Sequence, residues 1–318
     1  MTEVLVLTAP DEPDLPGLEQ LPEAVTVTHA RASETLSAGL KRAEILVVTD
    51  FNTNMLADCW PEQPAIRWVH ATSAGVDALM FPALRDSDLP LTNARGVFNR
   101  GIAEYVLGAV LLFAKDSLGN LHYQKQHRWQ HRETRLIAGQ QALIVGAGSI
   151  GTDVGRLLAA AGLEVVGTAR SDREIEGFSA VWAQERLPEL LPHADYVVIT
   201  APLNPQTQGL FDEQTFAAMK PSAHLINVGR GPIVQTQALI QALDQGELAG
   251  AALDVFEEEP LPEDSPLWDK PNVMISAHMA GDFIGWRRAL GEQFCANFER
   301  WQAGQELDNL VDKSRVGR

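Results

Sequence analysis

Short apolar runs alternate with segments of helical periodicity along most of the chain. In the first third, runs of the kind that form buried strands lie at Val4–Leu7, Val25–Thr28, Ile45–Val48, Arg67–His70 and Leu89–Thr92. Helices are predicted between them, near Ser33–Arg42, Met55–Trp60 and Asp77–Phe81. Strands that alternate with helices are typical of a parallel sheet with crossover helices. The pattern therefore predicts an α/β domain in this part of the chain.

The next segment, Asn99–Trp129, is predicted to form a long helix or a pair of helices. Its apolar residues recur at helical spacing and run nearly all round the helix: Ile102, Tyr105, Val106, Ala109, Val110, Leu112 and Phe113. A helix with so wide an apolar surface packs on more than one side. We expect this connector to join two domains and to form part of a homodimer interface.

After the connector the alternation begins again. Strands are predicted at Ala142–Val145, Glu164–Thr168, Tyr196–Thr200, His224–Val228, Gly250–Asp254 and Val273–Ser276. A final helix is predicted over Phe283–Trp301, and the simplest path for the chain is to return with this helix to the first domain. The chain is thus expected to hold two parallel-sheet domains, each Rossmann-like or flavodoxin-like. One consists of residues 1–98 and 283–318, and residues 99–282 are inserted into it as a second domain.

The hexapeptide GAGSIG, residues 146–151, follows a predicted strand and opens a helical pattern. Glycines at these positions let the strand turn sharply into the helix and let a pyrophosphate approach the backbone amides at the positive helix end. This context predicts a dinucleotide site that includes Gly146, Gly148, Ser149, Ile150 and Gly151. The preceding segment is then long enough to be a separate substrate domain.

Composition narrows the class of protein. Hydrophobic residues make up 45% of the chain, which argues against disorder, and the formal net charge of −17 disfavours nucleic acids and anionic membrane surfaces as partners. The first residues lack the basic region of a signal sequence, and Tyr105–Ala114 is too short to span a membrane. Cys59 and Cys295 show no metal-ligand spacing, so no metal site is expected. These features favour a globular protein of the cytoplasm.

Polar or glycine-rich segments follow three strands of the second domain, where an open parallel sheet places its ligands. They are NVGRGP at residues 227–232, DVFEEEP at 254–260 and SAHMAG at 276–281. Arg230 in the first could form a bidentate contact with a carboxylate. Each segment also has a structural explanation when taken singly: an arginine in a surface turn, a solvated acidic run, or a histidine with a satisfied ring.

In their order and spacing, these segments resemble the D-isomer-specific 2-hydroxyacid dehydrogenase family. The resemblance covers nearly the whole chain and includes SAGVD at residues 73–77, NARG at 93–96, IAEY at 102–105 and TAPL at 200–203. It implies an oxidoreductase that moves a hydride between a nicotinamide cofactor and a small acid.

The resemblance implies that Arg230, Glu259 and His278 are catalytic. When a hydride attacks the carbonyl carbon of a 2-oxo acid, His278 would supply the proton, and Glu259 would orient its ring and favour the imidazolium form. Arg230 would hold the substrate carboxylate and polarise the carbonyl. Within the acidic run, Glu259 is assigned because it directly precedes Pro260, as in the motif of the family.

The resemblance also assigns the binding residues. The backbone amides of Ala74, Gly75 and Val76 would form a second wall around the substrate carboxylate, opposite Arg230. Further cofactor contacts would come from strand ends in the second domain: Ala201, Pro202, Val228, Asp254 and His278.

The choice of cofactor depends on the second strand of the nucleotide domain. An NAD enzyme normally ends this strand with an acidic residue that binds the ribose 2′-hydroxyl, but here Ala169 stands near that point. Arg170, Ser171 and Arg173 follow, and these side chains could bind a 2′-phosphate. NADP is therefore the expected cofactor, with NAD possible, because Asp172 pointing inward would favour NAD instead.

Within the family, the Arg170–Ser171 pair and the short chain are most similar to the glyoxylate and hydroxypyruvate reductases. We therefore expect the protein to reduce a small anionic 2-oxo acid to the D-2-hydroxy acid with NADPH. Two alternatives stay open. One is a dinucleotide-binding regulatory protein like the transcriptional corepressors of this fold, and the other is a phosphite dehydrogenase-like enzyme. Formate dehydrogenases carry Gln where Glu259 stands, which argues against that activity.

Overall fold

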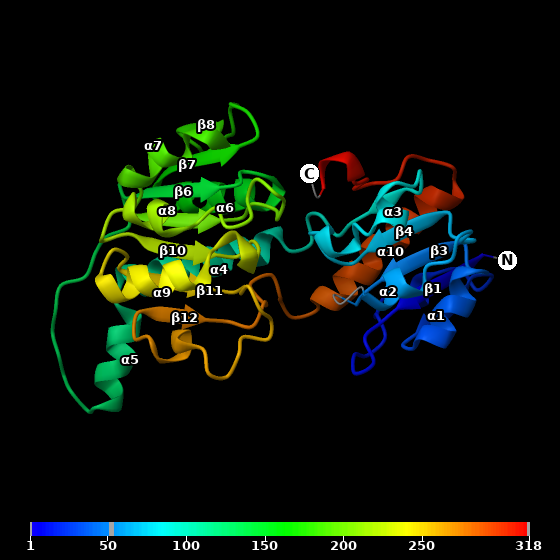
Figure 1. The fold of residues 1–318 in the computed structure, drawn as a ribbon, viewed down its shortest axis with the longest axis horizontal. Coiled ribbons are helices and arrows are strands. Elements are labelled where there is room, and N and C mark those ends of the chain that lie inside the picture. The colour runs from blue at the N-terminus through cyan, green and yellow to red at the C-terminus, as the bar shows by residue number, and fades with distance from the viewer. Residues whose placement is uncertain (1, 51–53, 317–318) are drawn as a thin grey trace. The chain divides into compact units, whose positions relative to one another are not determined.

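The computed structural model describes residues 2–50 and 54–316, and the chain divides into two compact units. Unit 1 comprises Met1–Phe98 and Phe283–Arg318, and unit 2 comprises Asn99–Asp282. Both units are layered α/β structures built on parallel sheets (Figure 1), which confirms the predicted fold class. Among the described residues, no helix combines the length and the apolar character needed to cross a membrane.

Unit 1 is built on a five-stranded parallel sheet with the order β2-β1-β3-β4-β5. Its strands are β1 (Glu3–Leu7), β2 (Thr26–Ala30), β3 (Ile45–Val48), β4 (Trp68–Ala71) and β5 (Leu91–Thr92). Its helices are α1 (Ser33–Leu40), α2 (Asn54–Cys59), α3 (Pro82–Arg85) and α10 (Trp286–Gln302). The inner strands β1 and β3 are almost wholly apolar because both faces of the sheet are covered there.

The two faces of this sheet carry separate cores. Leu5 and Leu7 face one cluster, which includes Leu36 and Leu40 of α1. On the other face, α10 packs against the sheet, and the rings of Trp68 and Phe294 stack with their centroids 5.2 Å apart. The C-terminal helix thus belongs to unit 1, although it follows unit 2 in the sequence.

Unit 2 is built on a seven-stranded parallel sheet with the order β12-β11-β10-β9-β6-β7-β8. Its strands are β6 (Gln141–Val145), β7 (Glu164–Ala169), β8 (Ala180–Ala183), β9 (Tyr196–Ile199), β10 (His224–Asn227), β11 (Gly250–Leu253) and β12 (Val273–Ile275). Its helices are α4 (Asn99–Ala114), α5 (Ser117–Lys125), α6 (Ser149–Ala160), α7 (Leu187–Leu190), α8 (Glu213–Ala217) and α9 (Thr236–Gln245). The strand order reverses between β6 and β9, the point at which open α/β sheets bind their ligands.

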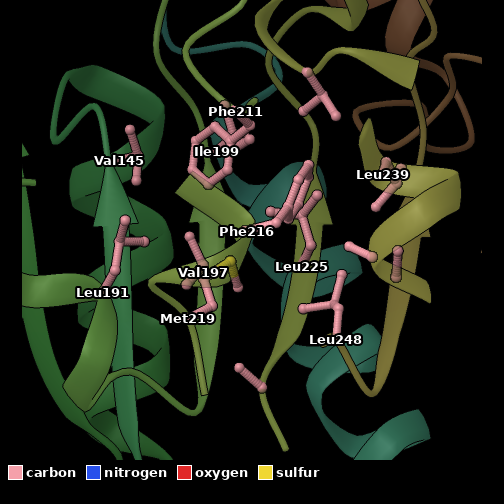
Figure 2. Close-up of a cluster of buried hydrophobic side chains, with 14 of the residues drawn as sticks. Val145, Leu191, Val197, Ile199, Phe211, Phe216, Met219, Leu225, Leu239 and Leu248 are labelled. Atoms are coloured by element: carbon pink, nitrogen blue, oxygen red, sulfur yellow. The ribbon is translucent and has the colours of Figure 1, made fainter. Parts of the chain in front are cut away.

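The largest core cluster of unit 2 lies over one face of this sheet. Val197 and Ile199 of β9 meet Phe211, Phe216 of α8 and Leu239 of α9 there (Figure 2). These side chains are 0–2% exposed. This packing holds the strands in register, so the loops that follow them leave from a rigid edge.

The connector is a pair of helices, α4 and α5, rather than one helix reaching Trp129. Asp116 separates the two with a positive φ of 46°, and its carboxylate caps α5 by accepting from the Gly119 amide at 3.2 Å. Residues 128–137 form neither helix nor strand and lead from α5 back to β6 (Figure 1).

Further elements differ from the prediction, among them α3, which was not expected, and α10, which begins at Trp286 rather than Phe283. The helix expected over Asp77–Phe81 is only a single 3₁₀ turn, Asp77–Leu79. Strand β8 was not expected. It is only four residues long, AVWA, and so short an apolar run does not distinguish a strand from a helix.

Candidate active site and cofactor site

The glycine-rich loop lies where β6 ends, at the reversal of strand order. Gly146 has a φ of +99°, and a Cβ built on it would lie 2.5 Å from the backbone of Ala201 at the end of β9. The amides of Gly146 and Ala147 donate to the Thr168 carbonyl oxygen at 3.2 and 2.7 Å. Glycine is therefore required where the loop turns against the neighbouring strand ends.

The other two glycines of the motif differ in their surroundings. A Cβ on Gly148 would meet nothing within 4 Å, whereas one on Gly151 would lie 2.3 Å from the Gly146 carbonyl oxygen. Helix α6 begins directly after Gly148, and no side chain caps its first turn. The bare backbone at Gly148 and the uncapped amides of α6 suit the pyrophosphate of a dinucleotide, so the loop fits the expected cofactor.

The remaining predicted cofactor residues of this edge lie within the GAGSIG segment or at the neighbouring strand ends. Ser149 is exposed, and its hydroxyl oxygen accepts from the Asn99 side chain at 2.9 Å, which leaves the hydroxyl hydrogen to be donated. Pro202 is exposed directly after the buried Ala201, and Val228 follows β10 at 8% exposure. Ile150 is half-buried within α6.

The loop after β7 carries the residues expected to choose the cofactor. Ala169 is the last residue of β7, so no carboxylate stands at the end of this strand. Arg170 and Ser171 are exposed, and among the described residues neither side chain has a hydrogen-bond or ion-pair partner. The Asp172 carboxylate accepts from the Ala183 amide of β8 at 2.7 Å. Asp172 therefore points towards the edge strand.

Arg230 follows β10 in a loop that lies against the DVFEEEP segment. A Cβ on Gly231 would lie 1.8 Å from the backbone of Phe256, so only glycine permits this approach. The Asn227 side chain fixes the loop from within, because it accepts from the Gly229 amide at 3.1 Å and donates to the Arg230 carbonyl oxygen at 3.2 Å. The Arg230 guanidinium is thereby placed beside Glu259, whose pKa it helps to lower.

Glu259 and His278 form a hydrogen-bonded pair. The His278 Nδ1 lies 2.8 Å from Glu259 Oε2, and the other carboxylate oxygen accepts from the Phe256 amide at 2.9 Å. Burial raises the pKa of Glu259, but the hydrogen bonds from His278 and Phe256 and the charge of Arg230 outweigh it and hold the pKa below its usual value. An ionised carboxylate only accepts, so Nδ1 of His278 carries the hydrogen of this bond.

Asp254, which the sequence assigned to the cofactor, is 2% exposed and holds the turn that carries His278. Its carboxylate accepts from the amides of Met279 and Ala280, each at 2.9 Å, and from the Ser276 hydroxyl at 2.5 Å. The His278 amide donates to the Asp254 carbonyl oxygen at 2.8 Å. These bonds support the left-handed backbone of His278, whose φ is +51°.

Tyr105 was missed as a site residue by sequence reasoning. Its phenol lies 2.7 Å from the Ser276 hydroxyl, and because that hydroxyl donates to Asp254, Tyr105 must donate to Ser276. Burial raises the pKa of Tyr105 to about 12. The only sequence signal was IAEY in the family resemblance, because the contact spans 171 positions.

Glu257 and Glu258 are set apart from Glu259 by their contacts. The Glu257 carboxylate accepts from the Thr236 amide at 2.7 Å, at the start of α9. A carboxylate at this helix end is favourable. Glu258 is exposed. Glu259 is thus the member of the acidic run that contacts the histidine.

In unit 1, the predicted substrate-binding segment Ala74–Val76 follows β4. Asn93 donates to the Ala74 carbonyl oxygen and Ser73 Oγ to that of Gly75, both at 2.6 Å. Within the described part of the chain, no group accepts a hydrogen bond from the amides of residues 74–76. The loop is thus held through its carbonyl groups while three successive amides remain to bind an anion.

Comparisons with known proteins place this geometry in a family. The NAD binding domain of the D-isomer specific 2-hydroxyacid dehydrogenases matches residues 107–280. Glyoxylate/hydroxypyruvate reductase A of Serratia proteamaculans is 33% identical over 257 residues, which cover 78% of this chain and 80% of that protein. An uncharacterised protein of Corynebacterium melassecola is 33% identical over 86% of this chain and 92% of its own length.

Two of the solved structures that match align with 99% of this chain and with 99% of their own chains. One is a D-isomer specific 2-hydroxyacid dehydrogenase from Xanthobacter autotrophicus Py2 in complex with NADPH and MES, with a TM-score of 0.86 and 31% identity. The other is the NADPH-dependent glyoxylate/hydroxypyruvate reductase of Sinorhizobium meliloti in complex with NADP and sulfate, with a TM-score of 0.87 and 29% identity. The resemblance found in the sequence is confirmed. The chain belongs to the D-isomer specific 2-hydroxyacid dehydrogenase family and is an NAD(P)-dependent oxidoreductase.

Proposed function

We propose that this protein reduces a small 2-oxo acid, such as glyoxylate or hydroxypyruvate, to the D-2-hydroxy acid with hydride from NADPH. The observation that carries the proposal is the His278–Glu259 pair at 2.8 Å, next to Arg230 and on the strand-end edge that also holds the glycine-rich loop. A proton donor, a cation for an anionic substrate and a dinucleotide cradle are the parts that this reaction requires.

His278 is the proposed general acid. When bound, reduced nicotinamide supplies the hydride that attacks the carbonyl carbon of the substrate. Negative charge then develops on the carbonyl oxygen, and His278 gives it the proton from Nε2. Glu259 fixes the ring through Nδ1 and, being ionised, stabilises the imidazolium form before the transfer.

Arg230 and the Ala74–Val76 loop are the proposed substrate ligands. The planar guanidinium of Arg230 can contact the carboxylate and the carbonyl oxygen together, which orients the substrate and stabilises the developing charge. The amides of residues 74–76 offer the carboxylate hydrogen bonds without adding charge. Each set of donors suits an anionic group.

NADPH is the proposed reductant because of the loop after β7. No acidic residue ends that strand, Arg170 and Ser171 have no partner among the described residues, and Asp172 turns to Ala183. A 2′-phosphate would find positive charge here, and the one carboxylate among residues 170–173, that of Asp172, is turned to the Ala183 amide. Relatives solved with NADPH or NADP support the same choice.

The proposal includes a homodimer that works in the cytoplasm. Helix α5 buries none of its residues, and apolar side chains stay exposed along it and the segment that follows: Leu121 at 53%, Trp129 at 100% and Leu136 at 76%. A second copy of the chain would cover them. The two free thiols, Cys59 and Cys295, are compatible with a reducing compartment.

Initial rates of NADPH oxidation with glyoxylate, hydroxypyruvate, pyruvate and phenylpyruvate test this function. We expect turnover with glyoxylate or hydroxypyruvate and a lower kcat/KM with phenylpyruvate. Tight NADPH binding without turnover of any 2-oxo acid would contradict the proposal and favour a dinucleotide-binding regulator. Turnover of phosphite with NADP in the absence of 2-oxo acid turnover would favour the phosphite dehydrogenase alternative.

A further inference from the structure

The two arginines of the cofactor-selecting loop differ in their contacts. Arg170 is exposed and has no partner among the described residues. The Arg173 guanidinium, only three residues further on, donates through Nη2 to the carbonyl oxygen of Ala147, the residue between the first two glycines of the dinucleotide loop. The Arg173 guanidinium binds a backbone carbonyl group, whereas the Arg170 guanidinium faces solvent, so the two side chains can serve different roles.

The Arg173 bond holds the second of the two backbone polar groups of Ala147. The Ala147 amide donates to the Thr168 carbonyl oxygen of β7 at 2.7 Å, and its carbonyl accepts from Arg173. The side chain of Ala147 is fully buried. Both polar groups of this residue are therefore held from β7 and from the loop that follows it. The next amides along the chain, from Gly148 onward, are those that suit the pyrophosphate.

The backbone around Arg173 is itself tied to the edge of the sheet. Its amide donates to the Val181 carbonyl oxygen of β8 at 3.1 Å, and the neighbouring Asp172 accepts from the Ala183 amide at 2.7 Å. Further along, the Ser179 amide donates to the Val165 carbonyl oxygen at 2.7 Å. The segment is thus anchored to β7 and β8 on both sides of its turn.

Phe178 supplies an apolar anchor for the same segment. A Cβ built on Gly155 of α6 would lie 2.1 Å from the Phe178 ring, and one on Gly167 of β7 would lie 2.9 Å from it. The ring therefore occupies a slot that exists only because both positions are glycine. This slot explains two glycines outside the GAGSIG motif and joins the segment to the helix that begins at the dinucleotide loop.

We infer that Arg173 is a positioning residue that holds the dinucleotide loop for NADPH and NADH alike, so that the 2′-phosphate is left to Arg170 and Ser171. The inference rests on the proposed preference for NADPH. A phosphate ligand contributes only when the phosphate is present. A residue that orders the pyrophosphate cradle contributes to both cofactors equally, because the pyrophosphate is common to both.

Dissociation constants of NADPH and NADH, measured by calorimetry without substrate, separate the two roles. Arg170→Ala should weaken NADPH about 10- to 100-fold and leave NADH within about threefold. Arg173→Ala should weaken both cofactors by a similar factor of about 5 to 10, so that their ratio stays within about threefold of the wild type. Arg173→Lys, which can still donate to the Ala147 carbonyl oxygen, should restore most of the affinity for both.

Phe178→Ala provides a second, independent variant. It should reproduce the pattern of Arg173→Ala, because it frees the same segment without removing charge. Thermal melting of each apoprotein shows that the variants are folded at the temperature of the titration. A selective loss of NADPH affinity in Arg173→Ala, or no change for either cofactor, would overturn the inference.

The same titrations tell a failure of this inference from a failure of the proposed function. If the wild type binds NADH more tightly and Arg170→Ala changes neither cofactor, the NADPH preference is wrong and the phosphate role of Arg170 falls with it. An equal loss of both cofactors in Arg173→Ala would still support the positioning role of Arg173.

Discussion

The amide of His278 donates to the carbonyl oxygen of Asp254 at 2.8 Å, and the Asp254 carboxylate binds the amides of the two residues that follow. A single buried residue thus fixes three successive amides of the turn that carries the proposed proton donor. Because His278 has a left-handed φ of +51°, the turn needs this support to keep the ring in place.

Asp254→Asn should lower kcat more than it weakens NADPH binding. The Asn side chain keeps one acceptor oxygen, but its NH₂ group faces backbone amides that are themselves donors. At least one of the hydrogen bonds to the Met279 and Ala280 amides is then lost, and the turn that carries His278 shifts. We expect a fall in kcat of about 10- to 100-fold, checked by steady-state kinetics together with NADPH titration. Ser276→Ala, which removes one neutral donor, should cost less. A loss confined to NADPH affinity would mean that Asp254 acts on the cofactor directly.

Glu259→Gln should move the alkaline decline of 2-oxo acid reduction to lower pH. The pKa of Glu259 is held below its usual value, so the carboxylate is ionised at neutral pH and favours protonated His278. Without this charge the ring loses its proton more readily as pH rises. This displacement is read from kcat/KM against pH. Glu258→Gln is the control, and an identical profile for both variants would argue against the pair.

Arg230→Lys should reduce turnover while sparing the cofactor. Lysine keeps the charge but loses the planar fork, so it cannot hold the carboxylate and the carbonyl oxygen together. A fall of about 100-fold in kcat/KM for the 2-oxo acid is expected, with the Kd of NADPH unchanged. Arg300→Lys, on the surface of α10, should leave both quantities as in the wild type. A change in NADPH affinity alone would mean that Arg230 is misassigned.

The strands and the glycine-rich loop could be predicted because their signals are local. Ile45–Val48 is apolar throughout, and the structure has the strand at these same residues. GAGSIG lies between a strand and a helix, as its pattern requires. Glu259 could be chosen over Glu257 only through the family motif, and the structure adds the physical distinction, since Glu257 caps α9.

Contacts between distant positions could not be predicted. Tyr105 meets Ser276 only because α4 packs within the unit whose strand β12 ends there. The bond from Arg173 to Ala147 depends on how the loop after β7 folds back. From the sequence, Arg170 and Arg173 are equivalent cations in one loop. The backbone path brings Arg173, and not Arg170, to the Ala147 carbonyl oxygen, and residue types alone do not reveal that path.

Sedimentation should show two chains per particle at micromolar concentration. Leu121→Arg places a charge on the exposed apolar surface of α5 and should shift the protein towards the monomer, because an unpaired charge is costly in an apolar interface. Leu310→Arg alters a leucine of similar exposure in unit 1, 42% against 53%, and should have no effect. A monomeric wild type would contradict the proposed dimer.

The most direct test of the account follows the hydride into the product. NADPH deuterated at both C4 positions is incubated with hydroxypyruvate and the protein. The D- and L-glycerate formed are separated by chiral chromatography, and their deuterium content is measured by mass spectrometry. The account predicts D-glycerate with one deuterium at C2. One deuteride passes from the labelled cofactor to the carbonyl carbon, and the proton from His278 goes to the carbonyl oxygen. L-glycerate, or glycerate without deuterium at C2, would contradict it.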